Sequence, residues 1–397
     1  MSKIKCEICG GEEHVIQTHL KKDHPEWTLE QYQAKYPNSP IMSEQAKQLL
    51  AQRAAERAKV AEGAGASAAM ATVADGAAVS KLVPREVVLK RPFHEVFELG
   101  SVPAAMNAMG KPIAMSVLAP HNHQELVPAI STNYVYDIEQ LKHVMLALEL
   151  RLPTYIYGHK GTGKSELLEQ VAARTNRPMA RVQHSANTEE SHIVGQWTVK
   201  GGETVFELGP LPLAMMHGWV YCADEYDFGM PSVLAVYQAV LEGKPLYIKE
   251  APADLRVIKP HDNFRFVATG NTNGAGDETG LYQGTLIQNS ANYDRFGVMI
   301  HKKYMPPEAE SLILQNHCKL QKPDADKMVK FANEIRTAFD GAKMSDTISP
   351  RSLINASKLG VLRGSFTLGL ELSFMAKLTR VDSEVAKGVA QRIFGGK

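Results

Sequence analysis

The residues whose types and spacing point most directly to chemistry lie in the run YIYGHKGTGKS, from Tyr155 to Ser165. The run fits the pattern G-x-x-x-x-G-K-[ST], whose glycines let backbone N–H groups curl around an anion. An apolar run precedes it and the helical pattern KSELLEQVAART follows it, so a helix N-terminus adds its positive dipole end. We therefore predict a site for the phosphates of ATP that consists of Gly158, His159, Lys160, Gly161, Thr162, Gly163, Lys164 and Ser165.

A pair of acidic residues predicts magnesium binding and hydrolysis at the same site. Asp224 and Glu225 end the apolar run GWVYCA, about sixty residues after Lys164. In such an arrangement the lysine reaches the β/γ-phosphates, and the Ser165 hydroxyl and the Asp224 carboxylate bind Mg²⁺. Glu225 is placed to polarise the attacking water as a general base. A chance glycine-rich turn or a solvated acidic turn would explain either motif alone, but together they favour ATP hydrolysis over ATP binding.

Motifs further along the chain complete a resemblance to a known family. They are the run NFRFVATGNT at 263–272, DRF at 294–296 and SPR at 349–351. With the two motifs above, their order resembles that of AAA+ ATPases of the MoxR branch and, more narrowly, the cobaltochelatase AAA+ subunits of CobS type. The similar stretches cover roughly residues 90–397. The run GDETGLYQGT is more specific than the phosphate loop, because general P-loop ATPases lack it.

The resemblance implies roles that spacing alone does not assign. Asn271 would hold the attacking water near the γ-phosphate, and Arg351 would contact the nucleotide from a helical lid. Arg295 would be an arginine finger that reaches into the neighbouring subunit's site, where its charge spreads over the phosphoryl oxygens. Without the resemblance, each arginine would be interpreted as an ordinary surface or salt-bridged side chain.

The resemblance also implies an architecture and partners. It predicts an α/β fold, in which an AAA+ P-loop NTPase core with a five-stranded parallel sheet carries a C-terminal helical lid. It predicts a homo-oligomeric ring, expected to be a hexamer, and a partner protein with a von Willebrand A domain. In cobaltochelatase itself, a third, large subunit inserts Co²⁺ into the corrin ring at the expense of ATP.

Composition along the chain predicts four segments. Residues 1–45 form a small finger domain, and residues 46–85 continue as a helix and then as a flexible linker too poor in apolar side chains to fold alone. Residues 86–305 form the ATPase core, and residues 306–397 form the lid. Strands are expected near residues 154–157, 180–184, 218–223, 264–269 and 297–301.

Two insertions are expected in the core. Residues 188–213 contain a hairpin with Gly201-Gly202 at its turn, and residues 246–259 suggest a second hairpin. The resemblance implies that the first insertion faces the pore of the ring. The alternative is that both insertions only pack against the core.

Cysteines and histidines near the N-terminus predict a zinc site. Cys6, Cys9, His19 and His24 have the spacing C-x₂-C-x₉-H-x₄-H, which suits tetrahedral Zn²⁺. The x₉ gap is short for the usual two-cysteine, two-histidine finger, and the segment resembles the Ros/MucR bacterial finger instead. Cys222 and Cys318 are expected to be small buried apolar residues, and disulfides are not expected.

Charge and hydropathy limit the partners. The chain has 44 basic and 43 acidic residues, so no strong field predicts nucleic-acid binding by the whole chain. No run of eighteen apolar residues and no apolar leader is present, so we expect a cytoplasmic protein without a membrane partner. Three functions remain open: a motor that remodels a partner protein, a DNA-associated ATPase recruited by its zinc finger, and a nucleotide-gated scaffold without turnover.

Overall fold

The structure is a computed structural model of the chain, and it describes residues 4–14, 16, 20, 23–24, 27, 29–37, 39–43, 88–100, 102–107 and 109–395. The chain divides into two compact units, Met1–Ala77 and Ala78–Lys397. The predicted helix and linker of residues 46–85 lie outside the described residues, as does His19. Within the described residues, no helix is both long enough and apolar enough to span a bilayer.

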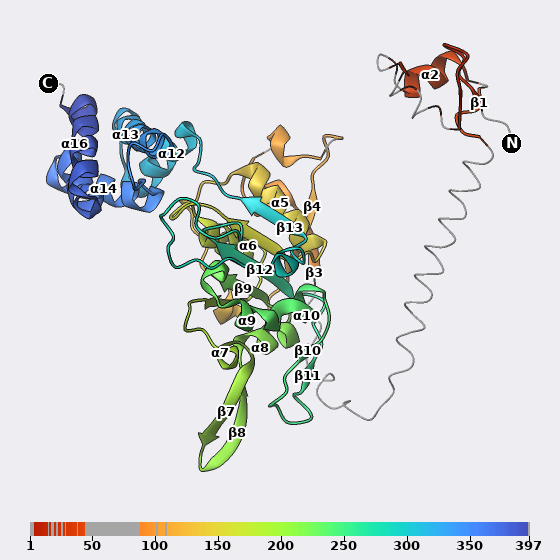
Figure 1. Cartoon of the computed structure of the whole chain (residues 1–397), viewed down its shortest axis with the longest axis horizontal. Helices are drawn as coiled ribbons and strands as arrows, with labels where there is room; N and C mark the ends of the chain where they lie inside the picture. Colours follow the sequence, from red (N-terminus) through yellow and green to blue (C-terminus); the bar gives the residue numbers. More distant parts are fainter. Residues whose placement is uncertain are drawn as a thin grey trace. The chain divides into compact units, whose positions relative to one another are not determined.

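A five-stranded parallel sheet forms the centre of the larger unit (Figure 1). Its strands lie in the order β13-β5-β12-β9-β6, so the first strand along the chain lies between the last two. This confirms the predicted parallel sheet, and each strand lies within two residues of its predicted place. The strands are β5 (Thr154–Tyr157), β6 (Met179–Gln183), β9 (Val220–Asp224), β12 (Arg265–Gly270) and β13 (Val298–His301).

Apolar side chains on both faces of the sheet build two cores. Alternate residues of a strand point to opposite faces, so Tyr155 and Ile156 enter different clusters. The cluster around Ile156 packs under α5 (Ile138–Glu149) and α6 (Lys164–Arg174). The cluster around Tyr155 is rich in aromatic residues and packs against α7 (Glu190–Val194), α8 (Pro210–His217) and the short helices after β9.

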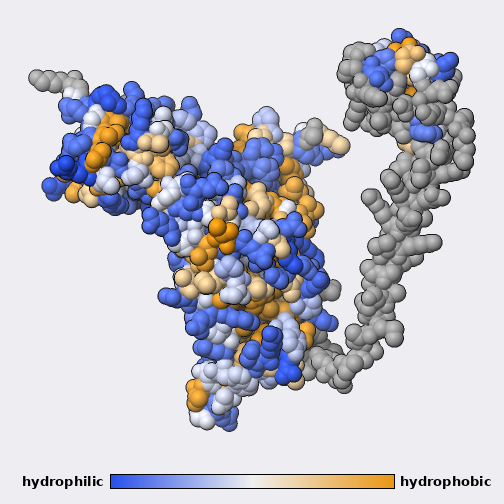
Figure 2. Space-filling view, in the orientation of Figure 1, coloured by the Kyte–Doolittle hydropathy of each residue, from blue (hydrophilic) through white to orange (hydrophobic). Residues whose placement is uncertain are grey.

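Three two-stranded sheets decorate the core. The hairpin of β7 (Gly195–Lys200) and β8 (Glu203–Leu208) extends well beyond the sheet, and Gly201 and Gly202 at its turn both have positive φ, as predicted (Figure 1). Its Val199 is 70% exposed, and an apolar patch is visible near the end of the hairpin (Figure 2). The others pair β10 (Leu246–Tyr247) with β11 (Val257–Ile258), as predicted, and β3 (Val88–Pro92) with β4 (Ala114–Leu118).

Short helices connect these strands and complete the core. They are α4 (Phe93–Val96), η1 (Pro103–Ala105), η2 (Gln124–Leu126), η3 (Tyr226–Phe228), α9 (Pro231–Leu234), η4 (Ala235–Tyr237), α10 (Gln238–Leu241) and α11 (Ser290–Tyr293). Cys222 in β9 and Cys318 in the lid are buried, as predicted, and burial raises the pKa of both thiols.

The chain is helical from Pro307 onward, which agrees with the expected lid. These helices enclose an apolar cluster of their own, and a buried ion pair between Arg336 and Glu310, 2.7 Å long, fixes α13 against α12. The Arg336 guanidinium also lies over the ring of Tyr304, which precedes the first helix. The helices are α12 (Pro307–Cys318), α13 (Lys322–Asp340), α14 (Pro350–Arg363), α15 (Phe366–Ser373), η5 (Met375–Lys377) and α16 (Arg380–Phe394).

The smaller unit has few described elements. They are β1 (Ile4–Lys5), paired with β2 (Glu12–Glu13), and α2 (Leu29–Lys35). Cys6, Ile16, Leu20 and Tyr32 form its described apolar cluster. The partly buried side chains of Ile4, Ile8, Trp27 and Tyr36 pack against this cluster.

Candidate functional site

The phosphate loop connects β5 to α6 at the carboxyl edge of the sheet. Gly158 and Gly161 have φ values of 149° and 73°, and a Cβ at Gly158 would lie 2.2 Å from the carbonyl oxygen of Lys302. A Cβ at Gly161 would lie 2.7 Å from the Cβ of Ser349, at the start of the lid helix α14. Only glycine fits these two positions, because both the backbone angle and the close neighbours exclude a side chain.

Lys164 begins α6 and its ammonium lies inside the loop. Its Nζ donates to the carbonyl oxygens of Gly158 at 2.7 Å and His159 at 3.1 Å, and to Asn271 Oδ1 at 3.1 Å. Burial lowers the pKa of Lys164 to about 8, although three nearby carboxylates oppose that shift. A triphosphate in the loop would favour the charged form further and raise this pKa, because it supplies negative charge at the ammonium.

Asp224 ends β9 and lies opposite the hydroxyl of Ser165. Its Oδ1 accepts from Ser165 Oγ at 2.8 Å and from Thr269 Oγ1, and its Oδ2 accepts from Arg181 Nε at 2.9 Å. Burial alone would raise the pKa of Asp224, but these hydrogen bonds outweigh it and lower that pKa. A carboxylate and a hydroxyl at this separation are the oxygen ligands that Mg²⁺ takes beside a nucleotide, so the donor set fits that ion.

Glu225 follows directly in a left-handed conformation with φ of 52°. This turn directs its carboxylate away from the sheet core, and its Oε2 accepts from Gln183 Nε2 at 2.7 Å. The backbone N–H of Glu225 donates to Thr269 Oγ1. A partly exposed carboxylate next to the magnesium ligand is placed to receive a proton from a water at the γ-phosphate.

Asn271 directly follows β12, and the buried carboxylate of Asp227 accepts hydrogen bonds from the backbone there. Asp227 Oδ2 accepts from the backbone N–H groups of Asn271 and Thr272, both at 2.8 Å, and from the Thr272 hydroxyl at 3.0 Å. Burial raises the pKa of Asp227 despite these bonds. Asp227 therefore fixes the loop that presents the Asn271 amide to Lys164.

One cleft brings most of the predicted residues together, but Arg295 lies elsewhere. The cleft has a volume of about 260 Å³ and is lined by Lys160, Gly161, Gly163, Lys164, Ser165, Asp224, Glu225, Asn271 and, from the lid, Arg351. Arg295 does not line it. Its Nε donates to Glu242 Oε1 at 2.7 Å and its Nη1 to the carbonyl oxygen of Ala291 at 2.6 Å.

A second cavity of about 280 Å³ adjoins the phosphate loop at Gly161, Thr162 and Gly163. Core and lid both contribute to its walls, which include Tyr134, Val135, Met305, Ile313 and Ile354. Lys302 also lines this cavity, and burial lowers its pKa to about 8. A mostly apolar wall with a few polar groups suits a purine base.

Sequence patterns did not indicate Arg181, Gln183 or Asp227. Arg181 lies in β6 and binds both Asp224 and Glu169. A charged residue inside an apolar strand, and a polar residue at its carboxyl end, were the available signals for Arg181 and Gln183. Asp227 gave no signal, because its partners at Asn271 and Thr272 are more than forty residues away.

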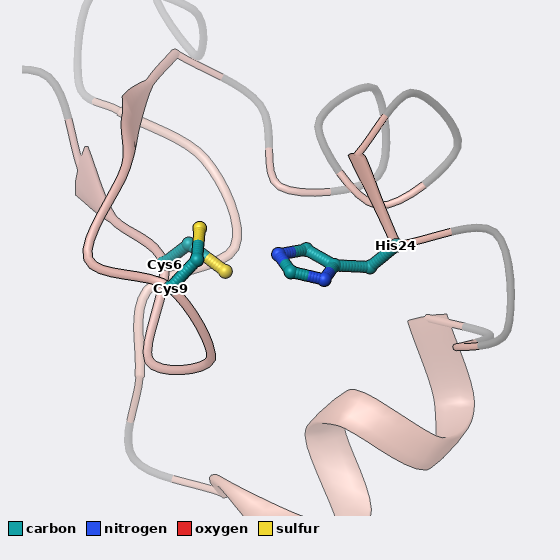
Figure 3. A group of neighbouring side chains, drawn as sticks. All are labelled: Cys6, Cys9 and His24. Atoms are coloured by element: carbon teal, nitrogen blue, oxygen red, sulfur yellow. The ribbon is translucent and has the colours of Figure 1, made fainter.

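A second candidate site lies in the smaller unit. The sulfurs of Cys6 and Cys9 and a ring nitrogen of His24 all lie within 4.8 Å of one another, and the three side chains turn toward one another (Figure 3). These are three of the four predicted zinc ligands, and the fourth, His19, lies outside the described residues. Two thiols and an imidazole in this arrangement fit tetrahedral Zn²⁺.

The sheet order, the phosphate loop at its carboxyl edge and the helical lid together define an AAA+ ATPase. Residues 153–285 match the model of the AAA domain of the dynein-related subfamily, and residues 310–391 match the CbbQ/NirQ/NorQ C-terminal domain. The enzyme class is therefore that of ATP hydrolases, and ATP and Mg²⁺ are the cofactors that this class implies.

Relatives define the family more narrowly. The aerobic cobaltochelatase subunit CobS of Sinorhizobium sp is 34% identical over 280 residues, which are 68% of this chain and 83% of that protein. The chain belongs to the same family of AAA+ ATPases as CobS. An uncharacterized protein of Staphylococcus haemolyticus is 28% identical over 239 residues, 58% of this chain and 86% of its own. The RuvB Holliday junction branch migration motor of Thermotoga maritima is 14% identical with a TM-score of 0.37, over 67% of this chain and 72% of that one.

Proposed function

We propose that this chain is the motor subunit of a ring, expected to be a hexamer, that hydrolyses ATP to drive or remodel a partner protein. The observation that carries the proposal is the convergence of Lys164, Ser165, Asp224, Glu225 and Asn271 on one cleft that the lid closes with Arg351. These residues come from four separate segments of the larger unit. Their meeting at one edge of the sheet is what phosphoryl transfer to water requires.

ATP would lie across both cavities. The phosphates would lie in the loop against Lys164, and the base would enter the apolar cavity that adjoins Gly161 to Gly163. Mg²⁺, when bound beside Ser165 and Asp224, supplies positive charge at the β/γ-phosphates. Glu225 would take the proton of the attacking water, and Asn271 would orient that water.

The position of Arg295 supports action between subunits. Its guanidinium lies outside the cleft of its own chain, where it binds Glu242 instead. A ring in which each subunit lends its arginine to the next would bring this charge to the transferring phosphoryl group. Such a dependence makes hydrolysis a property of the ring rather than of the single chain.

The partner is proposed to be a protein with a von Willebrand A domain. The long hairpin of β7 and β8 offers exposed apolar residues, Trp197 and Val199, on an arm that extends from the core. An arm of this kind is suited to contact another protein. Retention of metal insertion into a corrin, as in cobaltochelatase, is one form of this proposal. A pull-down with Glu225→Gln, which would trap the ATP-bound ring, tests for such a partner.

The second candidate function is that of a DNA-associated ATPase. It is favoured by the cluster of Cys6, Cys9 and His24, which would hold Zn²⁺ in a finger-like unit. ATP-stimulated DNA binding that weakens steeply with salt would support this function. DNA binding that is absent at low salt would leave the finger as a protein-binding module. In either case we propose a cytoplasmic location.

Replacing Lys164 by alanine is expected to abolish ATP binding. The change removes the only ammonium that donates to both Gly158 and His159 among the described contacts, and with it the charge over the β/γ-phosphates. An equilibrium titration with ATP measures the effect. Lys387→Ala, on the exposed face of α16, is the matched control and should bind normally. Unchanged affinity in Lys164→Ala would contradict the site.

Removal of zinc is expected to unfold the finger and to spare the ATPase. A chelator, or the double change Cys6→Ser and Cys9→Ser, should expose residues 1 to about 45 to proteolysis, because so small a core needs its metal. Metal analysis should find one zinc per chain. ATP hydrolysis by residues 90–397 should continue, since the larger unit has its own cores. A chain without zinc, or a truncation that stops hydrolysis, would refute this part of the account.

A further inference from the structure

The segment from Asn273 to Gln288, which we call the strap, carries the run GDETGLYQGT. It follows the Asn271 loop along the chain and precedes α11, and its C-terminal end is hydrogen-bonded to the turn after β9. There Leu286 N donates to the carbonyl oxygen of Asp227 at 2.8 Å, and Gln288 Nε2 donates to that of Gly229 at 3.0 Å.

The middle of the strap is folded around one carboxylate. Asp277 accepts from the backbone N–H of Thr279 at 2.9 Å and from that of Tyr282 at 2.6 Å. The carbonyl oxygen of Tyr282 accepts in turn from the Thr285 hydroxyl at 2.8 Å. These bonds close the strap on itself on both sides of Tyr282, so the backbone at that residue is held in one place.

Tyr282 reaches from the strap to the outer corner of the phosphate loop. It is 8% exposed, its hydroxyl oxygen accepts from the backbone N–H of Lys160 at 2.9 Å, and the same oxygen lies 3.1 Å from His159 Nδ1. When His159 carries its proton on Nε2, the phenol donates to Nδ1, and when the proton is on Nδ1, the phenol oxygen accepts a second hydrogen bond. Burial lowers the pKa of His159, which favours the neutral ring.

We propose that Tyr282 is a positioning residue for ATP binding, whose hydroxyl holds the Gly158–Lys160 corner of the phosphate loop in its receptive shape. The proposal rests on the proposed function, since it concerns the same nucleotide site. The strap ties that corner to Asp227, the acid that holds the Asn271 loop.

The shape of this corner determines where the Lys164 ammonium lies. Two of its three partners are the carbonyl oxygens of Gly158 and His159, which belong to the same corner. On the side of the corner that faces the lid, Lys160 Nζ binds Asp346 Oδ1 at 2.5 Å. Without the Tyr282 hydroxyl, a half-buried N–H loses its partner and the corner is free to turn toward the lid.

The test is the kinetic split produced by Tyr282→Phe, which keeps the ring and removes only the hydroxyl. We expect KM for ATP and the dissociation constant of a non-hydrolysable ATP analogue to rise about tenfold or more, with kcat within about twofold of the parent. Tyr247→Phe, at a phenol that is 58% exposed on β10, is the matched control and should change neither. Unchanged affinity in Tyr282→Phe, or a lowered melting temperature with no change in KM, would overturn the proposal.

A second pair of variants tests whether the N–H of Lys160 is the partner. Lys160→Ala removes the link to Asp346 and keeps the N–H, whereas Lys160→Pro removes both. Tyr282→Phe should raise KM about tenfold in the alanine chain and by less than twofold in the proline chain. An equal rise in both would overturn the proposal, and if the proline chain does not fold, Tyr282→Phe in the parent decides.

Two variants distinguish the role of Tyr282 from the ATPase function of the chain. Normal ATP binding by Lys164→Ala would contradict the function, whatever Tyr282 does. Loss of ATP binding in Lys164→Ala together with normal binding in Tyr282→Phe would overturn the role of Tyr282 alone.

Discussion

Arg295→Ala is expected to bind ATP with normal affinity and to hydrolyse it about 10³ to 10⁵ times more slowly. The arginine is absent from the cleft of its own chain, so its loss leaves the nucleotide contacts there intact. In a ring it would stabilise charge that develops only in the transition state, so the defect should appear in turnover rather than in affinity. Steady-state phosphate release and an ATP titration measure the two quantities separately.

The ion pair with Glu242 supplies the control for this variant. The alternative is a purely structural role, in which Arg295 affects activity through its contacts with Glu242 and Ala291 in its own chain. Glu242→Ala breaks that exposed pair and leaves the arginine, and such surface pairs contribute about 0–1 kcal/mol. Turnover by Glu242→Ala should therefore stay within a few-fold of the parent. Equal defects in the two variants would assign Arg295 a structural role instead.

Glu225→Gln is expected to bind ATP normally and to hydrolyse it about 10² to 10⁴ times more slowly. The amide keeps the shape of the side chain and cannot accept the proton of water. The left-handed turn at Glu225 and the contact with Gln183 both tolerate glutamine, so the fold should not change. Single-turnover hydrolysis with pre-bound ATP measures the chemical step.

The matched control is Glu308→Gln, an exposed glutamate in the first turn of α12. It makes the same chemical change far along the chain from the acidic pair and should leave turnover unchanged. A Glu225→Gln enzyme that turns over within a few-fold of the parent would remove Glu225 from the mechanism.

The sheet was predictable because each of its strands is a short apolar run with a clear end. β9 is buried at every residue, and the acidic pair marks where it stops. The order of the strands does not follow from periodicity, and it was expected only through the resemblance to AAA+ ATPases. In the structure β5 lies between β13 and β12.

The candidate site was predictable only where a local pattern carries the chemistry. Lys164 and Ser165 belong to one loop, so their spacing in the sequence suffices to find them. Arg181 binds Asp224 and Tyr282 binds the phosphate loop, each from a distant segment, and a single sequence does not show which strand or loop lies beside the site. Contacts of this kind depend on the sheet order, and they become visible only in three dimensions.

We propose that ATP is hydrolysed between subunits of a ring, and mixing two inactive variants tests this most directly. An Arg295→Ala subunit keeps an intact phosphate loop, and a Lys164→Ala subunit keeps an intact arginine. Where they alternate, the first binds ATP and the second supplies the guanidinium, so phosphate release should return in rings whose mixed composition is confirmed by mass. Mixed rings that remain as inactive as either parent would contradict the claim.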